Sequence, residues 1–356
     1  MLQWITKILD KVGSPELDWI QVEVTSHCNA ACIYCPQHLI GKKQHMPLTL
    51  FKRLLPYLGY TNLIYLQGWG EPLLNRDLFA MIEACKAKDK RVGFTTNGML
   101  LNEETVLRLV DLEVDILSVS LAGTNPSTHN RIRKGTDLAQ IIANLERLRQ
   151  IKEQKGALRP ALHLAYIMLV SNFNELPEVV GLAKRLGAEQ VVGSNLALIA
   201  QEALRQEALF NQQEKGQHFI IVLEGVAREA RREKLLFSYS SPLLQERSEH
   251  CSENTNYSCV VSVEGEVSPC VFISPTLSVT AGINGCKAMA RFYQNRPVAC
   301  YPLSFGNIGS ESLTRIWNKK EYLQFKRFYD PETKNQNMGS LQRPQSCMSC
   351  YKSFGA

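Results

Sequence analysis

The stretch Cys28-Asn29-Ala30-Ala31-Cys32-Ile33-Tyr34-Cys35 places three cysteines at the spacing C-x3-C-x2-C. It follows WIQVEVT at residues 19–25, whose β-branched and aromatic side chains predict a strand. Thiolates suit an iron–sulfur cluster or zinc, but zinc sites usually pair cysteines as C-x2-C twice and need a fourth protein ligand, here His27 or His38. Three thiolates on a cubane instead leave one iron open for a ligand. The spacing therefore favours an iron–sulfur cluster, with structural zinc as the alternative.

Outward from this loop, short strand-like runs alternate with helical patterns, which predicts βα units and a parallel sheet. The six predicted strands span residues 19–25, 62–68, 91–97, 115–121, 161–169 and 189–195. Amphipathic segments such as RDLFAMIEACKAK and DLAQIIANLERLRQIKEQ separate them and predict helices. The expected fold class is α/β, a partial (β/α)6 TIM-like barrel. It places the cysteine loop at the carboxyl end of the first strand, where such barrels carry their active sites.

The chain divides into four predicted segments. Residues 1–18 predict a short amphipathic N-terminal helix, 19–197 the partial barrel, and 198–240 a helical connection. Residues 241–356 are rich in Cys, Ser, Asn, Pro and Gly and contain one clear amphipathic helix, at 310–329. They predict a separate C-terminal domain that is held together by cysteines bound to metal.

Composition limits the class of protein. With 356 residues, 45% of them hydrophobic, the chain can bury two cores and is not disordered. A net charge of +6, spread among acidic residues, does not predict nucleic-acid binding. We expect a cytoplasmic protein, because no stretch is apolar enough to span a membrane and the N-terminus lacks an export signal. The eleven cysteines then indicate metal ligands rather than disulfides, apart from Cys85, a small buried residue inside a predicted helix.

Groups suited to a ligand stand at the ends of the next predicted strands. The second strand ends in Gly68-Trp69-Gly70-Glu71-Pro72, where glycines permit close approach of the backbone to a ligand. The third ends in Thr95-Thr96-Asn97-Gly98, by itself a turn signature. On the fourth, alternation predicts that Ser118 and Ser120 face the barrel interior while apolar residues face outward. Parallel strands are usually apolar on both faces, so these hydroxyls indicate a ligand; ordinary hydrogen-bonded serines are the alternative.

The triad, with Tyr34 directly before its third cysteine, resembles the cluster loop of the radical S-adenosylmethionine (SAM) superfamily, and the motifs after the next strands resemble that family as well. The resemblance implies a 4Fe–4S cluster on Cys28, Cys32 and Cys35 whose open iron binds SAM. In this family an electron from the cluster cleaves SAM to methionine and a 5′-deoxyadenosyl radical. Trp69 stands where the family's G-G-E-P motif has its first glycine. The implied SAM contacts are Tyr34 at the adenine, Gly68, Gly70 and Glu71 at the methionine, Asn97 after the third strand, Ser118 and Ser120 at the ribose, and Arg133 at the carboxylate, with Arg131 as second choice.

The C-terminal segment holds a second group of cysteines. Cys251, Gly265 and Cys270 form the pattern C-x13-G-x4-C, and Cys347 and Cys350 follow as C-x2-C, which resembles the SPASM or shorter twitch extension of radical SAM enzymes. Five cysteines are candidates for the four positions of one auxiliary 4Fe–4S cluster: Cys251, Cys259, Cys270, Cys347 and Cys350. Which one is spare stays open. Cys286 and Cys300 are too few to close a second cluster, although an incompletely ligated one stays open, and a four-cysteine zinc site is the alternative for the whole domain.

The leading functional hypothesis is a radical SAM oxidoreductase that abstracts a hydrogen atom from a small-molecule or cofactor-like substrate, with the auxiliary cluster assisting the oxidation. Only 18 residues precede the first predicted strand, too few for the leader-binding domain of many peptide-modifying members. A maturase acting on a peptide or protein side chain is the alternative, and a non-enzymatic iron–sulfur or zinc-binding module the second alternative. The resemblance also implies an electron donor such as flavodoxin or ferredoxin. The polar residues expected to line the barrel are Glu23, Tyr65, Gln67 and His163, none of which the sequence identifies as a catalytic base.

Overall fold

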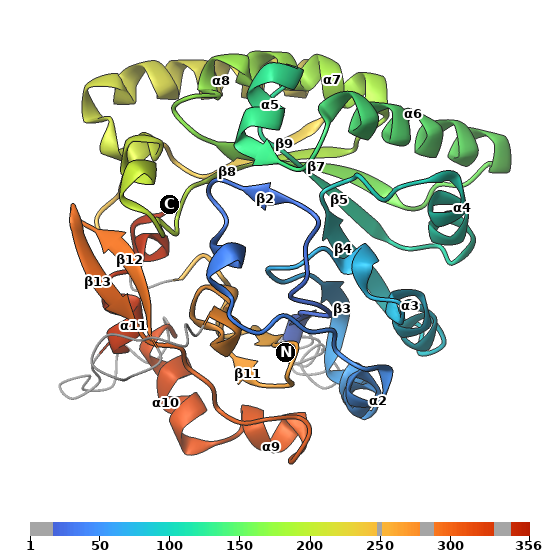
Figure 1. Cartoon of the computed structure of the whole chain (residues 1–356), viewed down its shortest axis with the longest axis vertical. Coiled ribbons are helices and arrows are strands. Elements are labelled where there is room, and N and C mark those ends of the chain that lie inside the picture. Colours follow the sequence, from blue (N-terminus) through green and yellow to red (C-terminus); the bar gives the residue numbers. More distant parts are fainter. Residues whose placement is uncertain (1–16, 248–250, 278–287, 331–342) are drawn as a thin grey trace, which may run out of the picture.

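Figure 1 shows the computed structural model of the chain, which describes residues 17–247, 251–277, 288–330 and 343–356. One sheet of nine strands runs in the order β11-β10-β1-β3-β4-β5-β7-β8-β9. Six of these strands match the predicted barrel strands and pair in parallel with one another: β1 (Leu17–Val22), β3 (Thr61–Leu66), β4 (Arg91–Thr96), β5 (Ile116–Leu121), β7 (Ala161–Met168) and β8 (Gln190–Asn195). The predicted α/β partial barrel is confirmed. The predicted N-terminal helix lies outside the described residues, except for residues 17 and 18, which begin β1.

Helices connect the strands and cover the outer face of the curved sheet (Figure 1). They are α2 (Leu48–Phe51), α3 (Leu78–Lys86), α4 (Glu103–Asp111), α5 (Pro126–Ile132), α6 (Leu138–Lys155), α7 (Val179–Leu186) and α8 (Gly216–Arg232). The ends of α6 show how the sequence sets such bounds. The Asp137 side chain accepts a hydrogen bond from the backbone N–H of Ala139 at 3.0 Å, and Gly156 ends the helix in the left-handed conformation with a φ of 63°.

Alternation along the strands separates an apolar outer face from a polar inner one. On β5, Leu117, Val119 and Leu121 are at most 1% exposed and belong to the main hydrophobic core under the helices. Ser118 and Ser120 take the other face, as predicted, because successive side chains of a strand point to opposite sides. The barrel interior therefore keeps hydrogen-bonding groups at a level where TIM-like barrels usually pack branched apolar residues.

Three further strands extend the sheet at its two ends. β9 (Leu236–Tyr239) pairs with β8 in parallel, β10 (Ser258–Val261) pairs with β1 in parallel, and β11 (Val267–Ser268) pairs with β10 in antiparallel fashion. The sequence did not predict that β10 and β11, from the C-terminal segment, would join the barrel sheet. Because β10 bonds to β1, the C-terminal segment is attached to the strand that leads into the cysteine loop.

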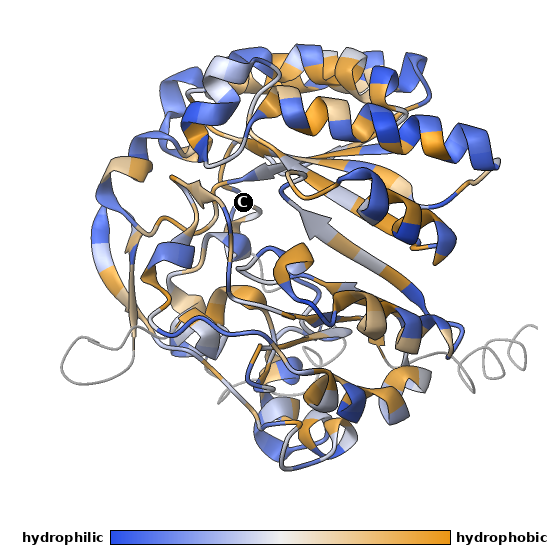
Figure 2. Ribbon diagram, turned by 45° about the vertical axis from the view of Figure 1, so that its right-hand side comes forward, coloured by the Kyte–Doolittle hydropathy of each residue, from blue (hydrophilic) through white to orange (hydrophobic). Residues whose placement is uncertain are grey.

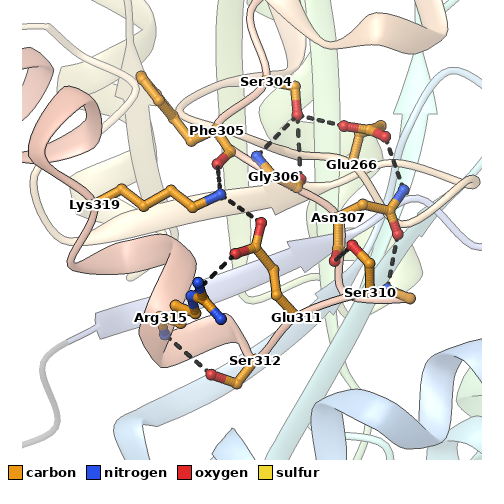
Figure 3. A network of polar contacts seen from close by, with 11 residues as sticks. Glu266, Ser304, Phe305, Gly306, Asn307, Ser310, Glu311, Ser312, Arg315 and Lys319 are labelled. Atoms are coloured by element: carbon orange, nitrogen blue, oxygen red, sulfur yellow. Dashed lines mark hydrogen bonds and ion pairs between the residues drawn. The ribbon is translucent and has the colours of Figure 1, made fainter.

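The rest of the C-terminal segment is a hairpin followed by short helices. The hairpin is formed by β12 (Met289–Tyr293) and β13 (Arg296–Cys300), and the helices are α9 (Leu313–Trp317), α10 (Lys320–Phe328) and α11 (Gln345–Met348). The single helix predicted at 310–329 is interrupted, because the backbone of Lys319 is extended. In Figure 3, the Lys319 ammonium pairs with Glu311 and donates to the carbonyl of Phe305 at 2.8 Å. These contacts attach the residue before α10 to Phe305 and Glu311.

Gly265 of the C-x13-G-x4-C pattern has a structural role. Its φ is +88°, and a Cβ there would lie 2.9 Å from the Asn307 side-chain oxygen. Its carbonyl accepts a hydrogen bond from the Ile308 N–H at 2.9 Å, and the Asn307 amide donates to Glu266 at 2.8 Å (Figure 3). The glycine thus lets residues 304–311 pack onto the turn between β10 and β11, shortly before Cys270.

Candidate active site and auxiliary cysteine site

The cysteine loop follows β1 and is held by a short antiparallel pairing in the centre of Figure 1. β2 (Ala31–Cys32) pairs with β6 (Arg133–Lys134), with Cys32 opposite Arg133. The residues of the triad are all partly buried and line one cavity of about 330 Å³: Cys28, Cys32 and Cys35. The loop therefore presents three thiols to a common space.

The electrostatics of the triad suit a metal cluster. Burial raises the pKa of Cys35 to about 12 and also raises the pKa of Cys28. The nearby guanidinium of Arg133 acts in the opposite direction and favours both thiolates. Coordination to a metal deprotonates a thiol outright. A bound metal group would therefore stabilise the thiolate form of these buried cysteines.

Arg133 is a buried cation beside the triad. It is 5% exposed, and one of its terminal nitrogens donates to the hydroxyl of Tyr34. Its Nε atom is buried and has no hydrogen-bond partner among the residues that the structure describes. A buried guanidinium with an unused donor is stabilised by an anionic ligand, so the site fits the carboxylate of SAM. Arg131, the second candidate, is exposed.

Glu71 links the ends of two strands. It is 2% exposed, and its carboxylate accepts hydrogen bonds from the N–H of Leu73 at 3.2 Å, the hydroxyl of Thr96 at 2.8 Å and the N–H of Asn97 at 2.7 Å. The side-chain amide of Asn97 then donates to the side-chain oxygen of Asn29 at 2.7 Å, inside the cysteine loop. Glu71 and Asn97 thus fix the shape of the site around the triad, and their predicted contacts with SAM stay predictions.

Gly68 and Gly70 allow the loop after β3 to lie against the chain around the triad. A Cβ on Gly68 would lie 2.2 Å from the Cγ atom of Glu23, and a Cβ on Gly70 would lie 2.2 Å from the carbonyl oxygen of Thr25. Neither position accepts a larger residue without movement of the backbone. The close approach that the sequence predicted for these glycines is toward protein; their approach to SAM stays a prediction.

Glu23 joins the barrel to the C-terminal segment. It is 2% exposed and accepts hydrogen bonds from the N–H of Trp69 at 2.8 Å, the N–H of Val263 at 3.4 Å and the hydroxyl of Thr276. Burial raises the pKa of Glu23. The indole of Trp69 packs edge-on against the ring of Phe272, with the centroids 6.2 Å apart. The loop that carries Glu71 is therefore in direct contact with the segment that carries Cys270.

Strand register aligns polar side chains in one layer of the barrel interior. Thr95 of β4 lies opposite Ser118 of β5, and Ser118 lies opposite His163 of β7. Ser120 lies two residues closer to the carboxyl end of β5. Burial lowers the pKa of His163, which keeps the ring neutral near pH 7 and able to donate or accept a hydrogen bond. We call Thr95, Ser118 and His163 the polar layer.

Hydrogen bonds continue the polar layer toward β1. The hydroxyls of Tyr65 and Thr95 are 3.0 Å apart, and Thr95 donates to the side-chain oxygen of Gln67 at 2.6 Å. The side-chain amide of Gln21 donates to the carbonyl of Gln67 at 3.1 Å. The result is a belt of amide, hydroxyl and imidazole groups across neighbouring strands, which suits a ligand rich in hydrogen-bonding groups.

Four of the five auxiliary candidates come together. They line one pocket although they stand far apart in the sequence: Cys251, Cys270, Cys347 and Cys350. Burial raises the pKa of Cys251 to about 12 and that of Cys347 to about 11. Four cysteines around one pocket fit a closed iron–sulfur cluster. Within the described residues, no three His, Cys, Asp or Glu side chains converge closely enough for a single metal ion, at this pocket or at the triad.

Cys259 lies apart from these four. It is fully buried on β10, opposite Ile20 of β1, and belongs to the main hydrophobic core. Besides burial, the group that affects its pKa is Lys326 rather than another cysteine. The geometry therefore points to Cys259 as the spare candidate. Cys300 is buried on β13, and Cys286 lies outside the described residues.

Sequence reasoning missed Asn29 and Gln201 and considered His38 only as a possible zinc ligand. Asn29, Gln201 and His38 carried no predicted SAM role, yet Gln201 and His38 line the triad cavity and their side-chain nitrogens are 3.0 Å apart. Asn29 stands between two triad cysteines, which is a signal that sequence reading can use. Gln201 comes from the chain beyond β8, and nothing local in the sequence marks it. The expectation for Cys85 is confirmed, since it is a fully buried residue of α3.

Comparison with known proteins agrees with this geometry. The model of the radical SAM superfamily matches residues 22–183, which include the triad. The chain belongs to this superfamily. The model of the SPASM iron–sulfur cluster-binding domain matches residues 251–351, which include the four cysteines of the second pocket. The protein is therefore a radical SAM enzyme, and its cofactors are SAM, a 4Fe–4S cluster and auxiliary iron–sulfur clusters in the SPASM domain. The two family matches disfavour zinc at both cysteine sites.

Individual relatives support the same assignment. A cofactor-modifying protein for the tungsten-containing aldehyde ferredoxin oxidoreductase of Pyrococcus furiosus is 26% identical over 316 residues, 87% of this chain and 83% of the relative. Streptococcus suis SuiB bound to S-adenosylmethionine has a TM-score of 0.62 at 14% identity and covers 100% of this chain and 74% of its own. The structure of anSMEcpe with bound AdoMet and Cp18Cys peptide has a TM-score of 0.63 at 17% identity and covers 96% of both chains. The two structures share the fold of this radical SAM enzyme.

Among the described residues, no helix of this radical SAM enzyme has the length and apolar character needed to cross a bilayer.

Proposed function

We propose that this radical SAM enzyme is an oxidoreductase that abstracts a hydrogen atom from a small polar or cofactor-like molecule held in the barrel. When bound, the cluster supplies the electron that cleaves SAM into methionine and a 5′-deoxyadenosyl radical. The observation that carries the proposal is the polar layer, whose three members Thr95, Ser118 and His163 face the barrel interior on neighbouring strands. A substrate there lies within the same barrel whose carboxyl end carries the triad.

The chemistry of the polar layer and its neighbours indicates the class of substrate. Amides, hydroxyls and a neutral imidazole pair well with the amide, hydroxyl and ring-nitrogen groups of a compact polar molecule. A specific polar site rejects analogues that leave its buried groups unpaired. The printed name of the P. furiosus relative describes a protein that modifies a cofactor, which supports a cofactor-like substrate here.

Residues around the triad would hold SAM in a reactive position. Arg133 would pair with the SAM carboxylate through its unused Nε donor. Glu71 and Asn97 would hold the loops around the SAM methionine in place, since their hydrogen bonds connect β3, β4 and the cysteine loop at Asn29. Tight positioning of the reacting atoms contributes several kcal/mol to lowering such a barrier, on the order of 7 or more in well-oriented cases.

The oxidation balances if the SPASM domain accepts one electron. An auxiliary cluster held there would supply an acceptor for one electron, so that loss of a hydrogen atom, one further electron and a proton from the substrate would amount to a two-electron oxidation. Glu23 and the packing of Trp69 on Phe272 support this arrangement, because they keep the SPASM domain in contact with the barrel. We propose Cys251, Cys270, Cys347 and Cys350 as the ligands of one auxiliary cluster.

The test begins with the enzyme reconstituted without oxygen. Incubation with SAM and dithionite should release methionine and 5′-deoxyadenosine, and the Cys32→Ala variant should release neither. Cys85→Ser is the matched control, because Cys85 is a fully buried residue of α3, and it should keep the activity. If the intact protein never cleaves SAM, the proposal is wrong.

The second step distinguishes the substrate classes. Extracts of cells grown in deuterated medium are separated into a fraction of small molecules and a fraction of peptides and proteins, and each is added with unlabelled SAM. Deuterium in 5′-deoxyadenosine from the small-molecule fraction supports the proposal. Deuterium from the other fraction alone favours a peptide or protein maturase and contradicts the small-molecule assignment.

A further inference from the structure

A second buried cation lies beside the pocket of the four auxiliary cysteines. Arg291 is the third residue of β12 and is 3% exposed. Its guanidinium donates to the carbonyl of Ser346 and, at 2.7 Å and 3.1 Å, to the hydroxyl of Ser349. Each serine directly precedes a pocket cysteine, Cys347 or Cys350. Arg291 therefore holds the C-x2-C segment that forms one side of the pocket.

The hairpin that carries Arg291 lies beside the end of the chain, which is marked C in Figures 1 and 2. In the hairpin turn, the N–H of Gln294 donates to the hydroxyl of Tyr351 at 2.9 Å. The exposed Arg247 donates to the hydroxyl of Tyr293 at 2.9 Å and to the carbonyl of Met348. These contacts fix the hairpin against the residues around the C-x2-C segment.

The charge of Arg291 has no acidic partner in the part of the chain that the structure describes. Both of its hydrogen-bond acceptors are neutral, and it forms no ion pair with a described carboxylate. Glu253 lines the pocket, but its carboxylate pairs with the Lys352 ammonium at 3.2 Å. A buried charge without a counter-charge is costly. An anionic group in the pocket would therefore stabilise the buried guanidinium.

An unpaired hydroxyl belongs to the wall of the same pocket. Thr255 is 3% exposed and lines the pocket together with the four cysteines. Its hydroxyl oxygen is buried and has no hydrogen-bond partner among the described residues. Buried hydroxyls are nearly always hydrogen-bonded, so this one is available to donate to a group bound in the pocket.

A cluster closed by four thiolates would supply the missing partner of both groups. Such a cluster is an anion, and its reduction adds one further negative charge. A nearby cation and a donated hydrogen bond stabilise the reduced form more than the oxidised form. Both groups therefore act on the cluster in the same direction, toward a higher reduction potential.

We propose that Arg291 and Thr255 raise the reduction potential of the auxiliary cluster. The inference rests on the proposed function, in which the four cysteines of the pocket hold that cluster and it accepts one electron. One electron leaves the substrate-derived radical and one enters the oxidised cluster, and no bond forms between the protein and the substrate. A higher potential makes this transfer more favourable.

The experiment measures the midpoint potential of the auxiliary cluster in the full-length chain. The background Cys28→Ala/Cys32→Ala/Cys35→Ala lacks the triad, so electron paramagnetic resonance during a reductive titration reports the auxiliary cluster alone. Arg291→Gln removes the charge and keeps an amide donor, whereas Arg291→Lys keeps the charge and loses the planar fork. Thr255→Val replaces the hydroxyl by a methyl group. The iron content of every variant is measured beside its potential.

Arg291→Gln should lower the potential by at least about 59 mV, which is a tenfold decrease in the equilibrium constant of a one-electron reduction. Arg291→Lys should stay closer to the background protein than Arg291→Gln does. Thr255→Val should decrease the same constant roughly threefold, as expected for one hydrogen bond. The controls are Arg315→Gln and Thr314→Val on α9, since neither residue lines the pocket, and both should leave the potential unchanged.

Several results would overturn the proposal. They are an unchanged potential in Arg291→Gln or Thr255→Val, and an equal decrease in Arg291→Gln and Arg291→Lys. Loss of iron from both Arg291 variants would also overturn it, because Arg291 would then only hold the ligands in place. Absence of iron from the background protein would do the same, since no auxiliary cluster would be present.

The proposed function is tested separately, by SAM cleavage in the enzyme with an intact triad. If the potentials shift as expected while the intact enzyme never cleaves SAM, the proposed function is wrong and the effect of Arg291 and Thr255 on the cluster stands. If SAM is cleaved and the potentials do not shift, only the present inference is wrong.

Discussion

The carboxylate of Glu71 accepts a hydrogen bond from the backbone N–H of Asn97 at 2.7 Å, although the two residues belong to loops after different strands. Asn97 in turn donates to Asn29 in the cysteine loop at 2.7 Å. The two contacts connect the loops after β1, β3 and β4 at the carboxyl end of the barrel. The shape of the site around the triad therefore depends on a buried carboxylate.

The Glu71→Gln variant tests this link. The amide removes the charge and turns one acceptor into a donor that faces other donors, so the loop after β4 should lose its fixed position. Hydrogen bonds to charged groups contribute about 1.5–3 kcal/mol, which predicts a roughly tenfold or greater loss of SAM affinity. Equilibrium binding of SAM to the reconstituted enzyme measures it. Glu83→Gln, an exposed change on α3, should leave the affinity unaltered.

Arg133 should be intolerant of conservative replacement. The guanidinium donates to Tyr34 from a terminal nitrogen and keeps its Nε donor for a second partner. Lysine has a single ammonium group and cannot reproduce this planar arrangement of two donors. We expect Arg133→Lys to lower SAM affinity by at least about tenfold, and Tyr34→Phe to have a smaller effect, because it removes one hydrogen bond of about 1 kcal/mol. Arg131→Lys, at an exposed site, is the control. Equal affinities of Arg133→Lys and the wild type would contradict the assignment.

The iron content of cysteine variants identifies the ligands of the auxiliary cluster. In a background that lacks the triad, Cys28→Ala/Cys32→Ala/Cys35→Ala, the protein should hold about four irons per chain. Adding Cys270→Ala should lower the iron content, because Cys270 lines the pocket of four cysteines. Adding Cys259→Ala should leave them in place, since Cys259 lies on β10 and does not line that pocket. Loss of iron in the Cys259→Ala protein would show that the geometric assignment is wrong.

His129 should make stability depend on pH. Burial lowers its pKa to about 3, and the ring is fully buried between the N–H of Ala122 at 3.3 Å and the hydroxyl of Thr136 at 3.2 Å. Between about pH 6.5 and 3 the unfolded chain binds a proton at this residue that the folded chain does not bind. The folded state should therefore lose up to about 1.4 kcal/mol for each pH unit below 6.5.

Denaturant unfolding at pH 7.5 and pH 5.5 measures this effect. His129→Gln should reduce the difference in the free energy of unfolding between the two pH values, even if it lowers stability at both. His218→Gln, at an exposed position on α8, should leave the difference as in the wild type. The same pH dependence in His129→Gln and in the wild type would assign the effect to other groups.

Local patterns in the sequence were sufficient for the barrel. The strands around Leu117 and Ser118 follow from alternation, and helix α6 from its cap at Asp137 and its stop at Gly156. These signals lie within a few residues of the structure they specify, since strand and helix periodicities and caps are short-range properties. The spacing of the triad is equally local, which is why Cys28 and its neighbours predicted their chemistry without a fold.

Only the tertiary structure decided which distant residues meet. It brought Cys270 to Cys347 in one pocket and left Cys259 outside that pocket, and it placed Glu23 against Thr276 across the boundary between barrel and SPASM domain. No periodicity carries such information, because contacts between residues tens to hundreds of positions apart depend on how the whole chain packs and on which strands share a sheet. The triad thus predicted an iron–sulfur cluster through its spacing and radical chemistry through its resemblance to the family, while the neighbours of the triad emerged only when β6, β10 and the C-terminal cysteines were in place.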